Sequence, residues 1–288
     1  MKVIILGCNG LLGQALLRSI PQKAVVLGVA RNQLTPDSNF QFIELDILKF
    51  DELKKQIEKF QPDYIINAAA YTNVDGCEDS NLSQEVNVKL PEFLSGLNVR
   101  LVHISTDYVF DGKSGPYSED DQINPISEYG RQKYESEKLV LANTDNLIVR
   151  TSLVYGYGIG LSLNFHDFVK NSLLEEKTIK IVNDQIGNPT LSNDLADAIW
   201  LLLKNNSSGI YNVSGSEILS RLEWALQIAD FYGLDNQYIK SCKTSDLNQK
   251  AMRPLKSGFK LTKIYKEFKS LSKRDLEHQI NSYEKGQS

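Results

Sequence analysis

The stretch Val3-Ile4-Ile5-Leu6-Gly7-Cys8-Asn9-Gly10-Leu11-Leu12-Gly13 places an apolar, β-branched run directly before three glycines. Such a run, apolar on both faces, is typical of a buried parallel strand. The Gly-x-x-Gly-x-x-Gly spacing predicts a tight turn whose backbone a pyrophosphate can approach, because glycines have no Cβ, and the helix that follows points its first amides at the phosphates. We therefore expect a dinucleotide site here, with a purely structural turn as the alternative. Its expected cofactor-binding residues are Gly7, Asn9, Gly10, Leu11, Leu12 and Gly13.

Short apolar runs alternate with amphipathic stretches through the first half of the chain, and this rhythm predicts parallel strands joined by helices. The expected strands are residues 3–6, 24–29, 40–45, 64–67, 101–104 and 147–150. The expected helices are residues 11–19, 51–60, 82–94 and 127–141. The fold class that follows is α/β, a Rossmann-type doubly wound parallel sheet with a smaller C-terminal substrate-binding part.

The alternation loosens after Arg150, where Gly156, Gly158 and Gly160 mark an irregular connection. Beyond it we expect helices at 165–174, 194–203 and 221–231, a short strand at 210–213, and a terminal helix within 256–273 that docks by its apolar side. Residues 1–152 are predicted to form the NADP-binding domain, completed by parts of 179–213. Residues 153–288 are predicted to form mainly the substrate-binding part.

Composition excludes several classes of partner. The 288 residues are 41% hydrophobic and 24% charged, with a formal charge of -4, so nothing attracts the chain to a nucleic acid. No segment approaches the roughly 18 apolar residues of a membrane span, and the first apolar run stops at Gly7, too short for a signal peptide. Three scattered cysteines and three histidines show no metal-ligand spacing, so we expect no metal site and a cytoplasmic protein.

The end of the second strand indicates which dinucleotide binds. An acid there commonly holds the ribose of NAD, but this chain has Arg31, and an arginine can pair with a 2′-phosphate. NADPH is therefore favoured, NADH stays open, and the alternative is that Arg31 is an ordinary solvated loop residue. The remaining expected cofactor contacts are Asp46 and Ile47 beside the adenine, and Ala68, Ala69 and Ala70 at the carboxyl edge of the sheet.

Polar groups cluster after the fifth strand, in Ser105-Thr106-Asp107-Tyr108, and about 20 residues later Tyr129 and Lys133 stand four apart on one helix face. A neighbouring ammonium favours the phenolate, so we expect Lys133 to lower the tyrosine pKa from its usual value of about 10. Tyr129 is then the expected general acid, with Lys133 also at the nicotinamide ribose. Tyr134 with Lys138, and Tyr265 with Lys269, repeat the spacing without following such a polar element.

Two other polar features have simple structural explanations. His103 lies inside an apolar strand and is expected to be a packed core residue. The acids Asp75, Glu78 and Asp79 precede a helix, where they compensate its N-terminal dipole.

Taken in order, these motifs resemble the extended short-chain dehydrogenase/reductase superfamily and, within it, the dTDP-4-dehydrorhamnose reductase family. The resemblance covers nearly the whole chain, and its most specific elements are Ser105-Thr106-Asp107-Tyr108-Val109-Phe110 and Asn183-Asp184-Gln185-Ile186-Gly187-Asn188-Pro189-Thr190. It also includes Asn67 to Asp75, Arg150-Thr151-Ser152 and Arg253-Pro254.

The resemblance implies reduction of the C4 ketone of dTDP-4-dehydrorhamnose, or of a related nucleotide-linked 4-keto-6-deoxy sugar. It implies that Tyr129 protonates the oxygen, that Lys133 tunes Tyr129, and that Thr106 donates a hydrogen bond to the same oxygen. It places Asp107 near the sugar, Asp184 and Gln185 at the nucleotide end, and Arg253 at the diphosphate. Two positions depart from the family pattern: Leu153 replaces a tryptophan that flanks the sugar, and Gln132 replaces a threonine. A homodimer is left open.

Two other functions stay open at this stage. A related branch of the superfamily serves as a non-catalytic NADP-binding regulatory subunit of methionine adenosyltransferase. A nucleotide-sugar epimerase or dehydratase is the other alternative, but dehydratases usually place an acidic pair after the Ser-Thr position, and here Asp107 is followed by Tyr108.

Overall fold

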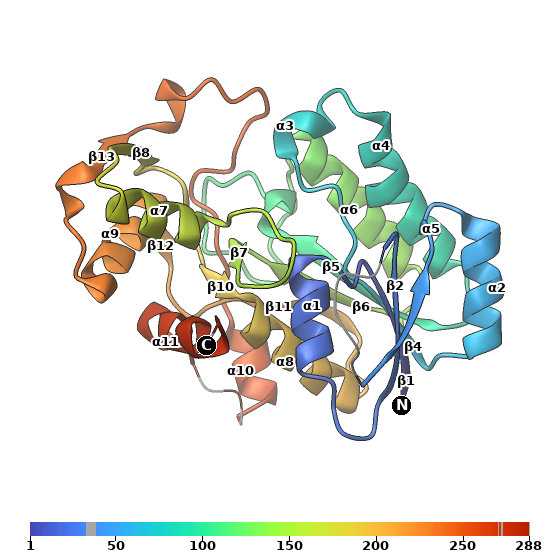
Figure 1. Ribbon diagram of the computed structural model, residues 1–288. Helices are drawn as coiled ribbons and strands as arrows, with labels where there is room; N and C mark the ends of the chain where they lie inside the picture. Colours follow the sequence, from blue (N-terminus) through green and yellow to red (C-terminus); the bar gives the residue numbers. More distant parts are fainter. Residues whose placement is uncertain (33–38, 270, 272, 288) are drawn as a thin grey trace.

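The computed structural model describes residues 1–32, 39–269, 271 and 273–287. Its centre is a seven-stranded parallel sheet with the order β11-β6-β5-β4-β1-β2-β3 (Figure 1). The strands are β1 (Lys2–Leu6), β2 (Val25–Ala30), β3 (Gln41–Glu44), β4 (Tyr64–Asn67), β5 (Arg100–Thr106), β6 (Leu147–Thr151) and β11 (Gly209–Asn212). The chain order reverses between β1 and β4, and open α/β sheets bind ligands beyond the carboxyl ends of the strands at such a switch point. The predicted doubly wound sheet is confirmed.

Helices cover both faces of the sheet, because successive side chains of each buried strand point to opposite faces. Val3 and Ile5 pack on the face covered by α1 (Leu11–Arg18) and α8 (Ser192–Lys204). Ile4 and Leu6 pack on the other face, covered by α2 (Phe50–Phe60), α5 (Leu90–Ser95) and α6 (Glu128–Leu141). Figure 1 shows these two helical layers on either side of the sheet.

A third apolar cluster forms the smaller part of the molecule around Tyr155, Trp224 and Tyr283, which are all buried. It is built from α7 (Phe165–Leu174), α9 (Arg221–Tyr232) and α11 (Leu276–Gln287), with the parallel pair β8 (Ile179–Val182) and β13 (Ile239–Cys242) beside them. In Figure 1 this cluster lies beyond the β7 and β10 edge of the sheet layer, on the side away from α2.

The remaining elements are short. Those of the first half are α3 (Val74–Cys77), α4 (Asn81–Gln84), the π-helix η1 (Glu85–Lys89) and the 3₁₀ turn η2 (Asp107–Val109). Those of the second half are β7 (Val154–Tyr155), β9 (Ile186–Gly187), β10 (Thr190–Leu191), β12 (Leu219–Ser220), η3 (Asn236–Tyr238), η4 (Thr244–Asp246) and α10 (Thr262–Glu267).

Two expected helices differ from those observed. The single helix expected over 82–94 is interrupted by the π-helix η1, where the Leu90 N–H donates to the carbonyl of Glu85 rather than four residues back. Pro91 has no N–H for the carbonyl of Asn87, so the regular α ladder cannot continue there. The helix expected within 256–273 is reduced to α10, and the chain ends in α11 instead.

The strand expected at 210–213 is β11, and it extends the sheet by pairing with β6, with Ile210 opposite Ile148. The division of the chain at residue 152 stays a prediction. Every helix in the described ranges is too short or too polar to cross a lipid bilayer.

Candidate active site

The glycine-rich turn brings β1, α1 and the chain after β4 into close contact. Gly7 has a φ of +75°, and a Cβ on it would lie 2.9 Å from the backbone of Ala69. A Cβ on Gly13 would lie 2.3 Å from the carbonyl oxygen of Gly7, so α1 can begin this close to the turn only with glycine there. The N-cap Gly10 offers no side-chain cap, and no acid lies in the first turn of α1. The amides of that turn are therefore suited to a bound anion.

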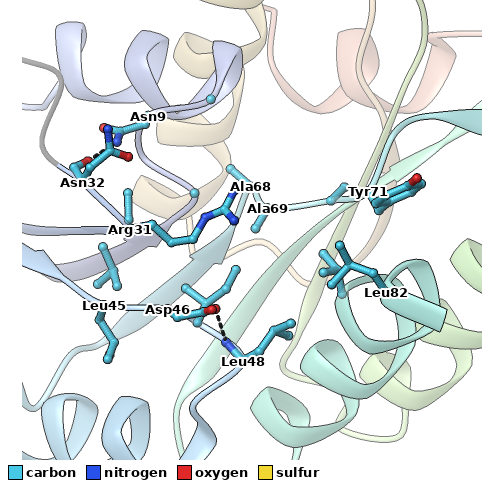
Figure 2. Close-up of a pocket in the computed structure, with 17 residues that line it drawn as sticks. Asn9, Arg31, Asn32, Leu45, Asp46, Leu48, Ala68, Ala69, Tyr71 and Leu82 are labelled. Carbon is cyan, nitrogen blue, oxygen red and sulfur yellow. Dashed lines mark hydrogen bonds between the residues drawn. The ribbon is translucent and has the colours of Figure 1, made fainter. Parts of the chain in front are cut away.

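A cavity of about 400 Å³ opens in front of this turn (Figure 2). Nine of the residues expected at the cofactor line it: Gly7, Asn9, Gly10, Arg31, Asp46, Ile47, Ala68, Ala69 and Ala70. Figure 2 shows the Arg31 side chain extending along the cavity toward Ala68, while an Asp46 carboxylate oxygen accepts a hydrogen bond from the Leu48 amide over 3.1 Å. The cavity fits a dinucleotide. Its lining includes Gly7, where a Cβ would collide with the backbone of Ala69.

Leu11, Leu12 and Gly13 do not line this cavity. Leu12 packs against the core, and Gly13 serves the close approach of α1. Eight other residues line the cavity and were not expected there from the sequence: Val29, Ala30, Asn32, Leu45, Leu48, Tyr71, Leu82 and Val86. Tyr71 and Leu82 come from the segments after β4, and their approach depends on how α3 and α4 pack.

Thr106 and Tyr129 come together at the carboxyl end of β5. Ser127 caps α6 by accepting the Gly130 amide over 3.2 Å, and a Cβ on Gly130 would lie 2.2 Å from the carbonyl oxygen of Tyr108. The glycine therefore lets the first turn of α6 sit against η2. There the Thr106 side chain is near enough to the Tyr129 hydroxyl to lower its pKa. The Tyr129 ring packs edge-on against Tyr108, with 5.5 Å between ring centroids.

The expected lowering of the Tyr129 pKa is wrong for this structure. Burial raises the pKa of the Tyr129 phenol above its usual value, Tyr108 raises it further, and the nearby Thr106 side chain opposes them. Lys133 does not contact the Tyr129 hydroxyl in this structure, because its Nζ donates to the carbonyl oxygen of Ile104 over 2.7 Å. Tyr129 is consequently a neutral phenol with a proton to donate.

A chain of polar contacts joins Lys133 to the wall of the cavity. Its Nζ lies 3.0 Å from Nε2 of His103, and Nδ1 of His103 lies 3.3 Å from the side-chain nitrogen of Asn67. The Asn67 oxygen in turn accepts the Ala69 amide over 3.3 Å. His103 is fully buried, as expected, but it is a polar partner of Lys133 rather than a packing residue alone. Burial lowers the pKa of Lys133 to about 8, and the nearby Glu137 carboxylate opposes that shift.

Asp107 is buried under three hydroxyl groups. Its carboxylate accepts hydrogen bonds from Thr106 and Ser152, both over 3.2 Å, and from Ser257. Burial raises its pKa, while these three hydroxyls lower it. Asp107 therefore fixes the Thr106 side chain and ties the end of β5 to the C-terminal part of the chain.

Other residues expected at the substrate have different positions. The carboxylate of Asp184 accepts hydrogen bonds from the amide and hydroxyl of Thr244, so it holds η4 in place. Gln185 lines a second cavity, of about 240 Å³, near α7 and α9. Leu153 has a left-handed backbone, with a φ of 47°, and its side chain lies beside Gly187.

Arg253 is paired with Asp75, whose carboxylate lies 3.0 Å from its Nη1. The acidic cluster was expected to serve a helix dipole, but Asp75 also accepts the Ala251 amide over 2.9 Å and Asp79 pairs with Lys250. These contacts join α3 to the loop that follows β13, and Figure 1 shows that loop reaching across to α3.

Gln132, one of the two departures from the family pattern, joins α6 to its neighbours. It is buried, accepts a hydrogen bond from Asn87 over 3.0 Å, and donates to Ser83 over 2.9 Å. Asn87 lies in η1 and also accepts the Tyr71 amide over 2.9 Å, so Gln132 braces the wall of the cofactor cavity. Across the described ranges, no three His, Cys, Asp or Glu side chains gather as metal ligands would.

A doubly wound sheet, a glycine-rich turn after β1 and a Tyr-Lys helix beside a Ser-Thr element define a member of the extended short-chain dehydrogenase/reductase class. The family model described as "RmlD substrate binding domain" matches residues 1–284. The chain belongs to the dTDP-4-dehydrorhamnose reductase family, as its motifs indicated.

Individual relatives match over nearly their full length. A dTDP-4-dehydrorhamnose reductase of Aggregatibacter actinomycetemcomitans is 34% identical, with 93% of each chain covered. The spore coat polysaccharide biosynthesis protein SpsK of Bacillus subtilis is also 34% identical, covering 88% of this chain and 87% of its own. A crystal structure of dTDP-4-dehydrorhamnose reductase from Bacillus anthracis in complex with NADP has a TM-score of 0.85 at 27% identity and covers 99% of each chain.

Proposed function

We propose that this chain catalyses the NADPH-dependent reduction of the C4 ketone of dTDP-4-dehydrorhamnose, or of a related nucleotide-linked 4-keto-6-deoxy sugar, to give dTDP-rhamnose or the matching alcohol. The observation that carries the proposal is the placement of Thr106 and Tyr129 together at the carboxyl end of β5, where the contact of Gly130 with Tyr108 brings the first turn of α6 against η2. The relatives support it, since one is named dTDP-4-dehydrorhamnose reductase and another binds NADP.

The residues around the first cavity are suited to hold the dinucleotide. The backbone of Gly7 to Gly13 would take the pyrophosphate, Arg31 the 2′-phosphate, and Asp46 and Ile47 the adenine. Ala68 to Ala70 leave room along the sheet edge, and we assign Tyr129 and Lys133 to the nicotinamide end, although neither lines the cavity. When bound, the reduced cofactor supplies the hydride for C4. NADPH is preferred because the residue after β2 is Arg31 and not an acid.

In the proposed reaction, a side chain of this protein supplies the proton that the carbonyl oxygen receives. Tyr129, which keeps its proton at neutral pH because its pKa is raised, gives that proton to the carbonyl oxygen as C4 becomes an alcohol carbon. The Thr106 hydroxyl, which donates its single proton to Asp107 in this structure, would turn that proton to the same substrate oxygen when the sugar binds. Although its Nζ donates to the Ile104 carbonyl in this structure, we propose that the Lys133 ammonium, one helical turn away, stabilises the phenolate that this transfer leaves behind. Leu153 and Gln185 are assigned to the substrate side; Asp184 acts there through Thr244. A cytoplasmic location and a homodimer stay predictions from the sequence.

The test is direct. Purified protein, given NADPH and dTDP-4-dehydrorhamnose, should consume NADPH and yield a dTDP-linked sugar whose mass is higher by two hydrogens. A panel of nucleotide-linked 4-keto sugars would identify the preferred substrate. Absence of turnover with every member of the panel would contradict the proposal.

The same assay separates the two alternatives. An epimerase or dehydratase would convert the substrate without net consumption of NADPH. A regulatory subunit would bind NADPH, turn over no sugar and form a stable complex with a purified methionine adenosyltransferase catalytic subunit.

A further inference from the structure

Arg221 is held at the start of α9 with its guanidinium against two aromatic rings. Its backbone amide donates to the carbonyl of Gln185 over 3.0 Å, and Ser220, just before it, caps the helix. The guanidinium carbon lies 4.9 Å from the ring centroid of Phe165 and 5.5 Å from that of Trp224. Stacking on aromatic faces fixes the plane of an arginine and leaves its N–H groups free to donate at the edges.

The N–H groups of the Arg221 guanidinium have no acceptor among the described residues. Most arginines of this chain do have one. Of its eight arginines, six donate to an acceptor within the protein. These are Arg18, Arg100, Arg131, Arg150, Arg253 and Arg274. The two others, Arg31 and Arg221, each line a cavity. Arg221 is partly buried, whereas Arg31 is exposed. Since a partly buried guanidinium without an acceptor costs free energy, the position of Arg221 is suited to an anion from outside the chain.

The cavity beside Arg221 has room for part of a nucleotide. It has a volume of about 240 Å³, and Phe165, Gln185 and Gln249 also line it. The amide of Gln185 contacts both Thr244 and Gln249, over 3.1 and 3.2 Å, so this wall is built from several segments. Aromatic rings, amides and a cation are the groups that recognise a base and its phosphates.

Electrostatics connects Arg221 to the chemical site. Burial lowers its pKa, and the nearby Asp107 and Tyr108 oppose that shift. The Tyr108 hydroxyl, which has no hydrogen-bond partner among the described residues, faces positive charge from both Arg253 and Arg221. The charge of Arg253 is balanced by Asp75 at 3.0 Å, whereas that of Arg221 has no ion-pair partner in the part of the chain that the structure describes.

We propose that Arg221 binds the phosphate oxygens of the nucleotide-linked substrate, and that it, rather than Arg253, supplies most of the phosphate recognition. This rests on the proposed function for the identity of the substrate. The planar guanidinium would donate paired hydrogen bonds to the diphosphate, while its aromatic stack sets the direction in which the sugar enters toward Thr106 and Tyr129.

The experiment measures phosphate recognition separately from turnover. Calorimetry on the NADPH-bound protein would give the dissociation constants of dTDP and of thymidine, and their ratio reports the contribution of the phosphates. In Arg221→Gln we expect the dTDP affinity to fall by about tenfold or more, because hydrogen bonds to charged groups are lost. The thymidine affinity should stay within about twofold. Arg221→Lys keeps the charge without the paired hydrogen bonds, so its dTDP affinity should lie between those of the parent protein and Arg221→Gln.

Two further variants are controls. Arg18→Gln removes an arginine that stacks 4.3 Å from the Tyr157 ring far from the substrate side, and it should leave the ratio unchanged. Arg253→Gln should reduce the ratio less than Arg221→Gln does. A folded Arg221→Gln protein that keeps the parent's ratio, or an Arg253→Gln protein that loses it instead, would overturn the proposal. If the ratio depends on Arg221 but no 4-keto sugar is reduced, the phosphate site stands and the proposed reaction fails.

Discussion

Nζ of Lys133 lies 3.0 Å from Nε2 of His103, deep beneath the carboxyl end of β5. The lysine is thus enclosed by an imidazole and the Ile104 carbonyl rather than by solvent, and its own backbone carbonyl accepts the Ser136 hydroxyl. Its closest carboxylate influence is Glu137, one helical turn away, and Glu137 is itself engaged by Arg150. Burial therefore determines the protonation state of Lys133, the residue that is proposed to assist Tyr129.

The first prediction concerns pH. Because burial lowers the pKa of Lys133 to about 8, its ammonium is present below that pH and is lost as the pH rises through it. The Tyr129 pKa is raised above its usual value, so the phenol keeps its proton over the same range. The kcat/KM for the 4-keto sugar should therefore fall on the alkaline side of about pH 8. A pH profile at saturating NADPH measures it.

Lys133→Arg tests whether Lys133 causes the fall in kcat/KM. An arginine stays charged, so the fall should move to higher pH. Lys138→Arg, on the exposed side of the same helix beside Tyr134, should leave the profile unchanged. An alkaline fall that stays in place in Lys133→Arg would assign it to another group.

The second prediction concerns the proton donor. Tyr129→Phe removes the proposed proton donor beside Thr106 and should lower kcat by about 10²-fold to 10⁴-fold, the usual contribution of a general acid. NADPH affinity, measured by fluorescence titration, should change little. Tyr134→Phe is the matched control, since Tyr134 lies on another face of α6 with Lys138 over its ring. Equal activity of the two variants would reassign the acid.

The third prediction concerns cofactor choice. Arg31 lines the first cavity and has no acceptor among the described residues, so it can serve the 2′-phosphate. Arg31→Ala should raise the KM for NADPH by about tenfold, the loss of one charge-assisted contact, and change the KM for NADH little. Steady-state kinetics with each dinucleotide give both values, and the NADH measurement is the internal control. An equal rise in the KM values for NADPH and NADH would show that Arg31 does not recognise the 2′-phosphate.

The sheet could be predicted from the sequence because its strands are short apolar runs separated by amphipathic helices. The strand expected at 64–67 is observed as Tyr64–Asn67, and the others differ from expectation by one or two residues at their ends. The π-helix could not be predicted from periodicity, since it depends on the missing N–H of Pro91 and on Asn87 binding the Tyr71 backbone. β8 and β13 were missed because two four-residue strands, 60 residues apart, show no alternation of their own.

At the candidate site, residues on local motifs were predictable and residues on packed segments were not. Thr106, Tyr129 and Lys133 follow from spacing along one strand and one helix. Arg221 becomes visible only when α7 brings Phe165 beside it. The hydrogen bond between Asp184 and Thr244 could not be predicted for a similar reason, because Thr244 reaches Asp184 from 60 residues away.

The last prediction concerns stability. Glu137 of α6 and Arg150 of β6 form a buried, two-pronged ion pair, with Nε to Oε1 at 2.9 Å and Nη2 to Oε2 at 2.7 Å. Removing one partner leaves an unpaired charge in the core, so Glu137→Ala should lower the free energy of unfolding by about 3–5 kcal/mol in urea titrations. Replacing both by methionine should recover most of that loss, because no charge is then left buried. The matched control is the exposed pair of Glu128 and Arg131 on the same helix, 3.1 Å apart, where Glu128→Ala should cost only about 1 kcal/mol or less. If the two single variants were equally stable, the Glu137 and Arg150 contact would not hold α6 against the sheet, and the position of Tyr129 would have to depend on the Ser127 cap and Gln132 instead.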